Sequence, residues 1–319
     1  MNVLVTGGAG FIASHLVDAY VQAGHNVVVV DNLSTGDAKL VNPKAHLEIC
    51  DIRDESFKRL VATGNFDLVN HHAAQIDVRI AVDNPSLDAA INILGSLNCI
   101  EGCLEGGVKK LIFISSGGAI YGEIPDTSLP VTESFPPRPL SPYGESKYTV
   151  ERYLYLMHQL QAFPFVTLRY GNVYGERQGK KGEAGVVSIF ARLLLKNKPV
   201  TIYGNGEQLR DYIHISDVVS ANMLVSDLNQ TPKNKNTVYD FAYNIGTGTG
   251  ESVNRLHAIM ENHCQTGRKA QYAPPRDGEI EKTFMNCSKA KNELGWQAQM
   301  SFADGLVQTV EWFRHNPDF

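Results

Sequence analysis

Short runs of apolar residues alternate with longer segments of helical periodicity through the first half of this 319-residue chain. The apolar runs predict buried β-strands at residues 2–6, 26–31, 46–50, 68–71, 111–115 and 165–169. The segments between them carry apolar residues three and four apart, which predicts helices at residues 11–23, 56–63, 86–105 and 142–161. Because continuously apolar strands must be covered on both faces, the alternation predicts an α/β fold with a doubly wound parallel sheet.

The alternation weakens in the second half of the chain. Residues 179–185 and 204–206 are rich in glycine and residues 231–236 are polar, so we expect loops there. Residues 238–245 could form a strand that returns to the first sheet. We therefore predict a first domain at residues 1–170 and a smaller α/β lobe at residues 171–319, with some segments returning to the first domain.

The composition is that of an ordinary globular protein, with 43% hydrophobic and 20% charged residues. A net charge of −5 gives no basic footprint for nucleic acid. The five cysteines are scattered without a C-x-x-C pair, which predicts neither a disulfide framework nor a metal site. Since no apolar run reaches membrane-spanning length and a strand follows Met1 directly, we expect a cytoplasmic protein without a membrane partner.

A glycine-rich turn, Gly7-Gly8-Ala9-Gly10-Phe11-Ile12, joins the first expected strand to the first helix. Gly7 permits a tight turn, and Gly10 lets the backbone approach a pyrophosphate at the helix N-terminus. Asp31 ends the second strand 24 residues after Gly7, where a carboxylate can bind a ribose diol and repel a 2′-phosphate. The pattern predicts a Rossmann-type site for NAD rather than NADP. The alternative is a tight turn in an α/β protein that binds no dinucleotide.

Tyr143 and Lys147 lie one helical turn apart behind Ser141 and Pro142, which together mark a helix start. A free phenol has a pKa near ~10, so ionising it at neutral pH costs about 4 kcal/mol. A neighbouring ammonium would lower that cost and make Tyr143 a usable proton acceptor. The alternative is chance, because a chain with 13 Tyr produces roughly one such pair by chance.

Taken in order, these motifs resemble those of the extended short-chain dehydrogenases/reductases, specifically the NAD-dependent nucleotide-sugar epimerase and dehydratase branch. The resemblance runs nearly from end to end and makes residues 1–170 the NAD-binding domain and 171–319 mainly the nucleotide-sugar lobe. It also implies a homodimer formed by helices around residues 86–104 and 143–160. The residues that it assigns to the cofactor are Gly7, Gly10, Phe11, Ile12, Asp31, Asn32, Asp51, Ile52, Ala73, Ala74, Asn92, Tyr143 and Lys147.

In that family a Ser or Thr completes the catalytic site with the Tyr and Lys. Counting forward along the strand at 109–114 gives Ser116, whereas counting backward from Tyr121 gives Gly117, which has no hydroxyl. We assign Ser116, with Ser115 as the alternative; a third possibility is that this Ser pair only ends a strand. The following Gly117-Gly118-Ala119 lacks the acid that the family's sugar dehydratases use, so the resemblance favours epimerisation over elimination.

The resemblance also implies a substrate site for a UDP-sugar. It assigns Asn172, Arg210, Arg276 and Glu279 to the diphosphate and uridine ribose, and two Arg forks suit a diphosphate well. Each Arg could instead be a solvated surface charge. Thr283 falls near a family position that faces the hexose 2-substituent, where Thr leaves room for an N-acetyl group.

The sequence thus predicts an isomerase that carries out NAD-dependent 4-epimerisation of a UDP-hexose through a transient 4-keto sugar. UDP-Glc and UDP-Gal are the expected substrates, and UDP-GlcNAc and UDP-GalNAc are expected to be tolerated. Rival predictions are another nucleotide-sugar enzyme of the family, such as a uronate epimerase or a reductase, and a non-catalytic NAD or nucleotide-sugar sensor.

Overall fold

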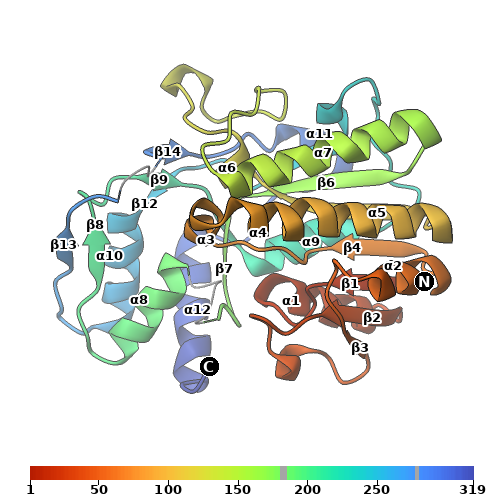
Figure 1. The fold of residues 1–319 in the computed structure, drawn as a ribbon. Helices are drawn as coiled ribbons and strands as arrows, with labels where there is room; N and C mark the ends of the chain where they lie inside the picture. Colours follow the sequence, from red (N-terminus) through yellow and green to blue (C-terminus); the bar gives the residue numbers. More distant parts are fainter. Residues whose placement is uncertain (180–184, 277–279) are drawn as a thin grey trace.

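A seven-stranded parallel sheet forms the centre of the molecule in the computed structural model, which describes residues 1–179, 185–276 and 280–319. The strand order is β11-β6-β5-β4-β1-β2-β3, so the sheet is doubly wound outward from β1 and β4 (Figure 1). The predicted fold class is therefore confirmed. The strands are β1 (Asn2–Thr6), β2 (Asn26–Asp31), β3 (His46–Ile49), β4 (Leu68–His71), β5 (Lys110–Ser116), β6 (Phe165–Tyr170) and β11 (Ala242–Ile245).

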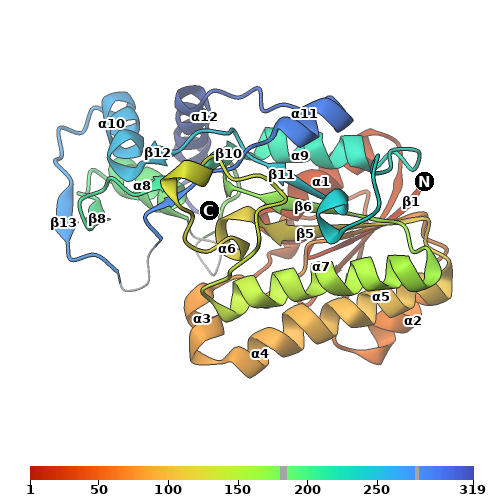
Figure 2. The same cartoon turned by 90° about the horizontal axis from the view of Figure 1, so that it is seen from above.

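Two helical layers cover the sheet, as Figure 2 shows from above. Alternate residues of the strands face opposite layers, so Val3 and Val5 pack against one helical layer, whereas Leu4 packs against the other. This two-sided burial explains why the strands read as continuous apolar runs. One layer holds α1 (Phe11–Gln22), α9 (Ile215–Val225) and α11 (Ser288–Leu294); the other holds α2 (Glu55–Thr63), α5 (Gly95–Gly106) and α7 (Pro142–Gln161).

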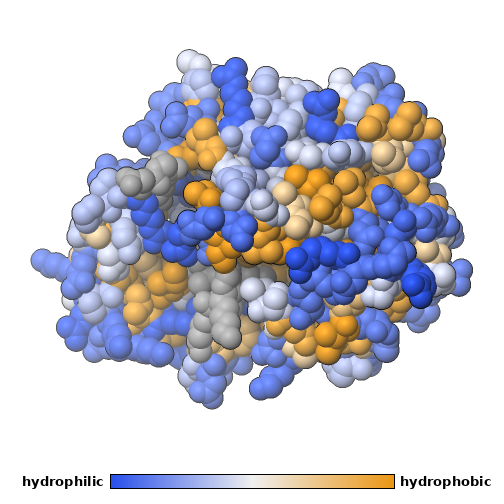
Figure 3. Space-filling model, in the orientation of Figure 1, coloured by the Kyte–Doolittle hydropathy of each residue, from blue (hydrophilic) through white to orange (hydrophobic). Residues whose placement is uncertain are grey.

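The helix at residues 85–106 is continuous but changes its winding. It starts as α4 (Pro85–Ala89), passes through the π-helical turn η2 (Ala90–Leu94) and continues as α5. By length and composition alone this 22-residue helix could span a membrane, so the expectation that no run was long enough was wrong. In the structure 44% of its most apolar stretch is buried in the protein. Figure 3 shows apolar residues on the surface over this helix and its neighbours.

The second lobe is built around short strands and three helices with their own core. In it α8 (Val186–Leu195), α10 (Val253–Cys264) and α12 (Phe302–His315) pack together around Phe190, Leu256 and Val310. Its strand pairs are β7 (Asn172–Tyr174) with β10 (Tyr212–His214), β8 (Thr201–Tyr203) with β13 (Gln271–Ala273), and β9 (Leu209–Arg210) with both β12 (Glu251–Ser252) and β14 (Lys282–Thr283).

Segments from the second half return to the first sheet. The expected strand at 238–245 divides into a 3₁₀ turn, η4 (Val238–Phe241), and β11, which pairs with β6 at the sheet edge. Lys110 on β5 fixes the end of α9, because its buried ammonium donates to the carbonyls of Val225, Asp227 and Gln230. The remaining elements are the short helices α3 (Val78–Asp83) and α6 (Gly117–Ile120) and the 3₁₀ turns η1 (Ala38–Leu40) and η3 (Asp126–Ser128).

Candidate active site

The glycine turn leaves the carboxyl end of β1 and packs tightly against the neighbouring strand. Gly7 has a φ of +70° and donates its N–H to Val30 O at 2.7 Å, and a β-carbon on it would approach Ala73 N to 2.8 Å. Gly10 is the N-cap of α1 and can offer no side chain to its first turn. Backbone amides and the helix N-terminus are therefore presented at this point, which is the arrangement that binds a diphosphate.

Asp31 and Asp51 stand at the ends of β2 and β3, beside the glycine turn. Asp31 accepts hydrogen bonds from Ala9 N (3.0 Å) and Leu33 N (2.8 Å), and burial raises the pKa of its carboxyl. Asp51 is held by both nitrogens of the Arg53 fork, which keeps the pKa of this carboxyl well below its usual range. Asn32 donates to Asp51 at 2.9 Å.

These groups line a cavity of 240 Å³ that also includes Gly7, Gly10, Ile52, Ala73 and Ala74. The glycine turn at one end of the cavity suits the diphosphate of a dinucleotide, and the Asp31 carboxylate at the other end suits its ribose. NAD therefore fits the residues present.

Asn92 lies behind the loop that follows β4. Its side-chain amide accepts from Gln75 N (2.8 Å) and donates to Gln75 O (2.9 Å), so it fixes the backbone of a residue that lines the cavity. Asn92 stands in the π-helical turn η2, where the extra residue per turn aims it inward. Any effect of Asn92 on a cofactor would pass through this loop.

Ser116, Tyr143 and Lys147 meet at the carboxyl end of β5. Ser141 caps α7 by accepting from Gly144 N at 3.2 Å, with Pro142 in the first turn, as the sequence predicted. The Ser116 hydroxyl lies close enough to Tyr143 to act on the pKa of its phenol, and Lys147 Nζ donates to Ile114 O at 3.0 Å. Lys147 Nζ also lies 5.9 Å from the centroid of the Tyr143 ring.

All three side chains line a second cavity, of 220 Å³, which shares Gly7, Gly10 and Ala74 with the first. The predicted catalytic groups and most of the predicted cofactor residues therefore surround connected space. Phe11 and Ile12 line this second part.

Burial controls the charge state of the pair. It raises the pKa of Tyr143 to about 12, with the Ser116 hydrogen bond acting to lower it and the charge of Asp88 acting to raise it. Burial also lowers the pKa of Lys147 to about 8, opposed by Asp88 and Glu151. At neutral pH Tyr143 is therefore a neutral phenol, whereas Lys147, whose lowered pKa still lies above neutral pH, remains mainly an ammonium. The expected lowering of the Tyr143 pKa is not the net result here, because desolvation outweighs it.

The structure separates Ser116 from its two alternatives. Ser115 is buried, and its hydroxyl has no hydrogen-bond partner among the residues that the structure describes. At Gly117 a side chain would collide with the thioether of Met285. Of these three residues, only Ser116 both lines the cavity and acts through its hydroxyl to lower the pKa of Tyr143.

The residues predicted to bind substrate are less closely gathered. Asn172 is exposed at the start of β7, next to Gly118. Arg276 is exposed, stacks on Tyr203 with its guanidinium 4.1 Å from the ring centroid, and lines a separate cavity of 690 Å³. Arg210 donates to Leu209 O at 2.9 Å.

Two further predicted positions bear on the sugar. Thr283 is buried in β14, with no partner for its hydroxyl in the described ranges. Glu279 lies outside the residues that the structure describes.

Several polar residues around the site could not be found from sequence motifs. Asp88 is fully buried and bonded to α7, and Glu151 forms a buried ion pair with Arg169 at 2.5 Å. Gln178 lines the catalytic cavity from the second lobe. His214 caps α9 and lies 3.5 Å from Glu176, so its side chain has a structural role. Among the described residues, no cluster of His, Cys, Asp and Glu could hold a metal ion.

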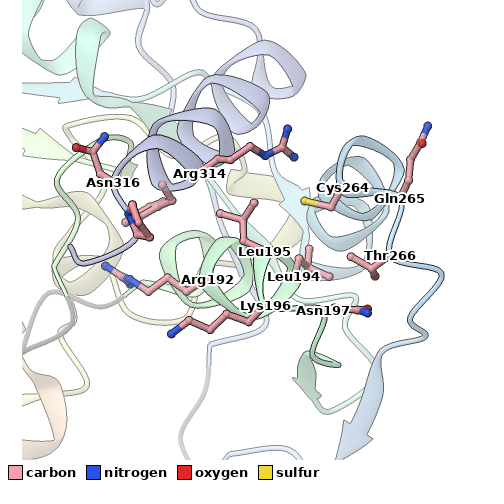
Figure 4. A pocket seen from close by; sticks show the side chains of 12 residues that line it. Arg192, Leu194, Leu195, Lys196, Asn197, Cys264, Gln265, Thr266, Arg314 and Asn316 are labelled. Carbon is pink, nitrogen blue, oxygen red and sulfur yellow. The ribbon is translucent and has the colours of Figure 1, made fainter.

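A cavity of 510 Å³ lies away from these groups, where α8, α10 and α12 all end (Figure 4). Arg192, Lys196 and Arg314 line it and complement the negative ends of the helices. The Arg192 guanidinium also stacks on Phe313, with 4.4 Å to the ring centroid. The ends of these helices explain the cations.

The chain matches known proteins over its whole length. Residues 3–246 match the sequence profile of the NAD dependent epimerase/dehydratase family. A putative UDP-glucose 4-epimerase of Methanocaldococcus jannaschii is 43% identical, with 98% of this chain and 99% of that protein covered.

Solved structures agree. The UDP-glucose 4-epimerase of Thermotoga maritima with UDP-glucose superposes with a TM-score of 0.93 at 43% identity, covering 99% of this chain and 100% of that one. The UDP-N-acetylglucosamine 4-epimerase of Methanobrevibacter ruminantium gives a TM-score of 0.88 at 32% identity, covering 99% and 98%. The resemblance read from the motifs is confirmed, and the chain belongs to the NAD-dependent epimerase/dehydratase family.

Proposed function

We propose that this protein is an NAD-dependent 4-epimerase of UDP-hexoses. The observation that carries the proposal is the Ser116–Tyr143–Lys147 cluster, which opens onto the same space as the glycine turn and Asp31. The Gly117-Gly118-Ala119 segment after Ser116 supplies no acid for elimination of water. Reversible oxidation at one carbon needs only a base and a hydride acceptor. The names of the relatives, UDP-glucose 4-epimerases, support the same chemistry.

In the proposed reaction Tyr143, as its phenolate, takes the proton of the sugar C4 hydroxyl while Ser116 holds that oxygen by a hydrogen bond. When bound, NAD supplies the acceptor for the C4 hydride and then its donor. Lys147 keeps one N–H on Ile114 O and offers its remaining donors to the site, where the nicotinamide ribose would lie. After the 4-keto sugar turns, Tyr143 returns the proton to the new C4 oxygen.

We assign the diphosphate of the substrate to Asn172, Arg210 and Arg276, with Glu279 at the uridine ribose. Arg276 lines the 690 Å³ cavity beside β8, β13 and β14, and Arg210 lies on β9, which pairs with β14. A guanidinium on each side of a diphosphate gives both charge and bidentate hydrogen bonds. In this assignment residues 1–170 bind NAD and residues 171–319 mainly bind the nucleotide sugar.

Product analysis tests the proposal against its rivals. UDP-Glc, UDP-GlcNAc and UDP-glucuronate are incubated separately with the purified protein, without added NAD, and the products are resolved by NMR. We expect UDP-Gal from UDP-Glc, and no conversion with Tyr143→Phe. Conversion of UDP-glucuronate alone would indicate a uronate epimerase, and net NADH a reductase. Binding without any conversion would indicate a sensor.

We further infer that N-acetylated hexoses are accepted, because Thr283 is a small residue at the proposed gate. The likeness to a UDP-N-acetylglucosamine 4-epimerase supports this. Thr283→Tyr should lose UDP-GlcNAc conversion while UDP-Glc conversion persists, with Thr283→Ser as the matched control. Equal loss of both conversions in Thr283→Tyr would reject the assignment.

We also infer a cytoplasmic homodimer. The outer face of α7 exposes Leu156 and Leu160, which is 67% exposed, and Leu94, directly before α5, is exposed as well. An apolar surface on two long parallel neighbours suits a self-complementary interface. Leu160→Glu should yield a monomer by light scattering, whereas Glu145→Gln, an exposed change on the same helix, should not. A monomeric unmodified protein would reject the inference.

A further inference from the structure

Asp88 is a fully buried carboxylate beside the proposed catalytic pair. It lies on α4 and accepts hydrogen bonds from three neutral side chains: Ser146 Oγ at 2.6 Å, Asn92 Nδ2 at 2.8 Å and Gln75 Nε2 at 3.1 Å. All three neighbours donate, which is the pattern that an ionised carboxylate requires. Burial of a carboxylate costs free energy of folding, so its position next to the active site suggests a role there.

The three donors come from parts of the protein that the active site must hold in register. Ser146 precedes Lys147 on α7 and lies less than one turn from Tyr143. Gln75 belongs to the loop after β4 and lines the proposed cofactor cavity, and Asn92 fixes its backbone. Asp88 therefore joins the start of α7 to the loop beneath the cofactor.

Charge is the second consequence of this placement. The titratable groups that face Asp88 from α7 are Tyr143 and Lys147, and the Asp88 charge raises the pKa of each. The charge of Glu151, farther along α7, also raises the pKa of Lys147. The charge of Lys147 in turn lowers the pKa of His72, which follows β4. Of the two carboxylates near Lys147, Asp88 raises its pKa more than Glu151 does.

We propose that Asp88 is a positioning residue of the active site, which ties the start of α7 to the cofactor loop and holds a fixed negative charge beside Tyr143 and Lys147. This role rests on the proposed function, in which Tyr143 and Lys147 are the catalytic pair. Asp88 keeps Lys147 protonated against the cost of burial. It does so at the expense of making the Tyr143 phenolate harder to form.

Titration of Lys147 tests the charge without any turnover. The protein is labelled with ¹³C at lysine Cε, and the Lys147 signal is identified by its loss in Lys147→Met. Wild-type Lys147 should titrate near its lowered pKa of about 8. Asp88→Asn should move that midpoint down by about one unit, because the ammonium loses a buried counter-charge.

Two matched variants separate charge from structure. Ser146→Ala removes one hydrogen bond to Asp88 but keeps the charge, so the Lys147 midpoint should stay within about 0.3 units of wild type. Asp83→Asn makes the same chemical change at an exposed carboxylate on α3, and it should leave the titration midpoint of Lys147 unchanged. If Asp88→Asn does not fold, Asp88→Ser offers a smaller neutral residue that still presents an oxygen to Ser146 and Asn92.

The pH dependence of kcat gives the second readout. In Asp88→Asn the acidic side of the kcat–pH profile should shift to lower pH and the maximal rate should fall. In Ser146→Ala the rate should fall while the acidic side of the profile stays at the same pH. A Lys147 midpoint that is the same in wild type and in the neutral Asp88 variant would overturn the proposal. Absence of turnover in the wild type would overturn the proposed function alone, since the NMR titration needs no substrate.

Discussion

The thioether of Met285 occupies the space that a side chain at Gly117 would need. Met285 is fully buried and is fixed from two sides: its N–H donates to Asp211 at 3.1 Å, and its backbone bridges Val131. The loop after β5 therefore packs its backbone directly on a segment from the end of the chain. This contact explains why the position four residues before Tyr121 is a glycine and why the active-site hydroxyl must come from Ser116.

A hydroxyl moved to residue 117 should not restore activity. We expect Ser116→Ala to lower kcat by about 10²-fold or more, in line with the loss of a hydrogen bond that acts in the transition state. Adding Gly117→Ser should give no recovery and should lower the free energy of unfolding by about 1–3 kcal/mol through overpacking. Steady-state kinetics and urea unfolding check both effects. Recovery in the double variant would show that Met285 can yield and that residue 117 is the true position.

Lys147→Met should abolish activity and yet stabilise the protein at neutral pH. Folding lowers the pKa of Lys147 from 10.5 to about 8, so burying the ammonium costs about 3 kcal/mol at most at pH 7, part of which Met recovers. The unfolded chain binds the Lys147 proton more strongly, so wild-type stability rises between pH 8 and 10.5. The difference between the two proteins should shrink over that range.

Denaturant unfolding at several pH values measures this difference. Ser146→Ala, which leaves the ammonium in place, should show the pH dependence of the wild type. A Lys147→Met protein that is less stable than the wild type at pH 7 would contradict the desolvation argument.

Asp31→Asn should weaken the preference for NAD over NADP. The carboxylate accepts from two backbone N–H groups and would repel a 2′-phosphate, so its neutralisation removes that repulsion. We expect the ratio of NADP to NAD dissociation constants to fall by about tenfold, and NAD itself to bind more weakly because the turn loses a charged acceptor. Calorimetry with cofactor-depleted protein gives both constants. Asp37→Asn on the adjoining loop is the control, and an unchanged ratio in Asp31→Asn would reject the role of Asp31.

Removal of one partner of the Arg169–Glu151 pair should destabilise the protein strongly, whereas replacement of both should cost much less. Arg169 is fully buried, donates to Glu151 at 3.0 and 2.5 Å, and also binds Tyr121 Oη at 2.9 Å. Arg169→Met leaves the Glu151 charge buried and should cost about 3–5 kcal/mol. Adding Glu151→Leu should restore much of that loss, as measured by urea unfolding. A single variant that unfolds like the wild type would mean that the pair is not buried in solution.

The parts of the site that lie within one segment were predictable from the sequence. The turn at Gly7 and Gly10 and the spacing of Tyr143 and Lys147 carry their own signals, because a turn and a helix are local structures. Strand patterning likewise gave the parallel sheet. These features needed no knowledge of what packs against them.

Contacts between distant segments were not predictable in this way. Nothing local marks Met285 as the residue that fills the space at Gly117, or Asp88 as the partner of Ser146. The effect of Lys147 on Tyr143 was also misjudged, because spacing shows proximity but not desolvation, and burial reverses the net direction of the pKa shift.

The most direct test of 4-epimerisation follows the hydrogen at C4. UDP-glucose carrying deuterium at C4 is incubated in ordinary water with the protein as purified, and the UDP-galactose formed is examined by NMR and mass spectrometry. The proposed cycle returns the same hydride to the opposite face of the sugar, so the product should keep its deuterium at C4, with no net NADH. A product with protium at C4 would contradict this account, because the hydrogen would then have exchanged with solvent rather than been held in the site.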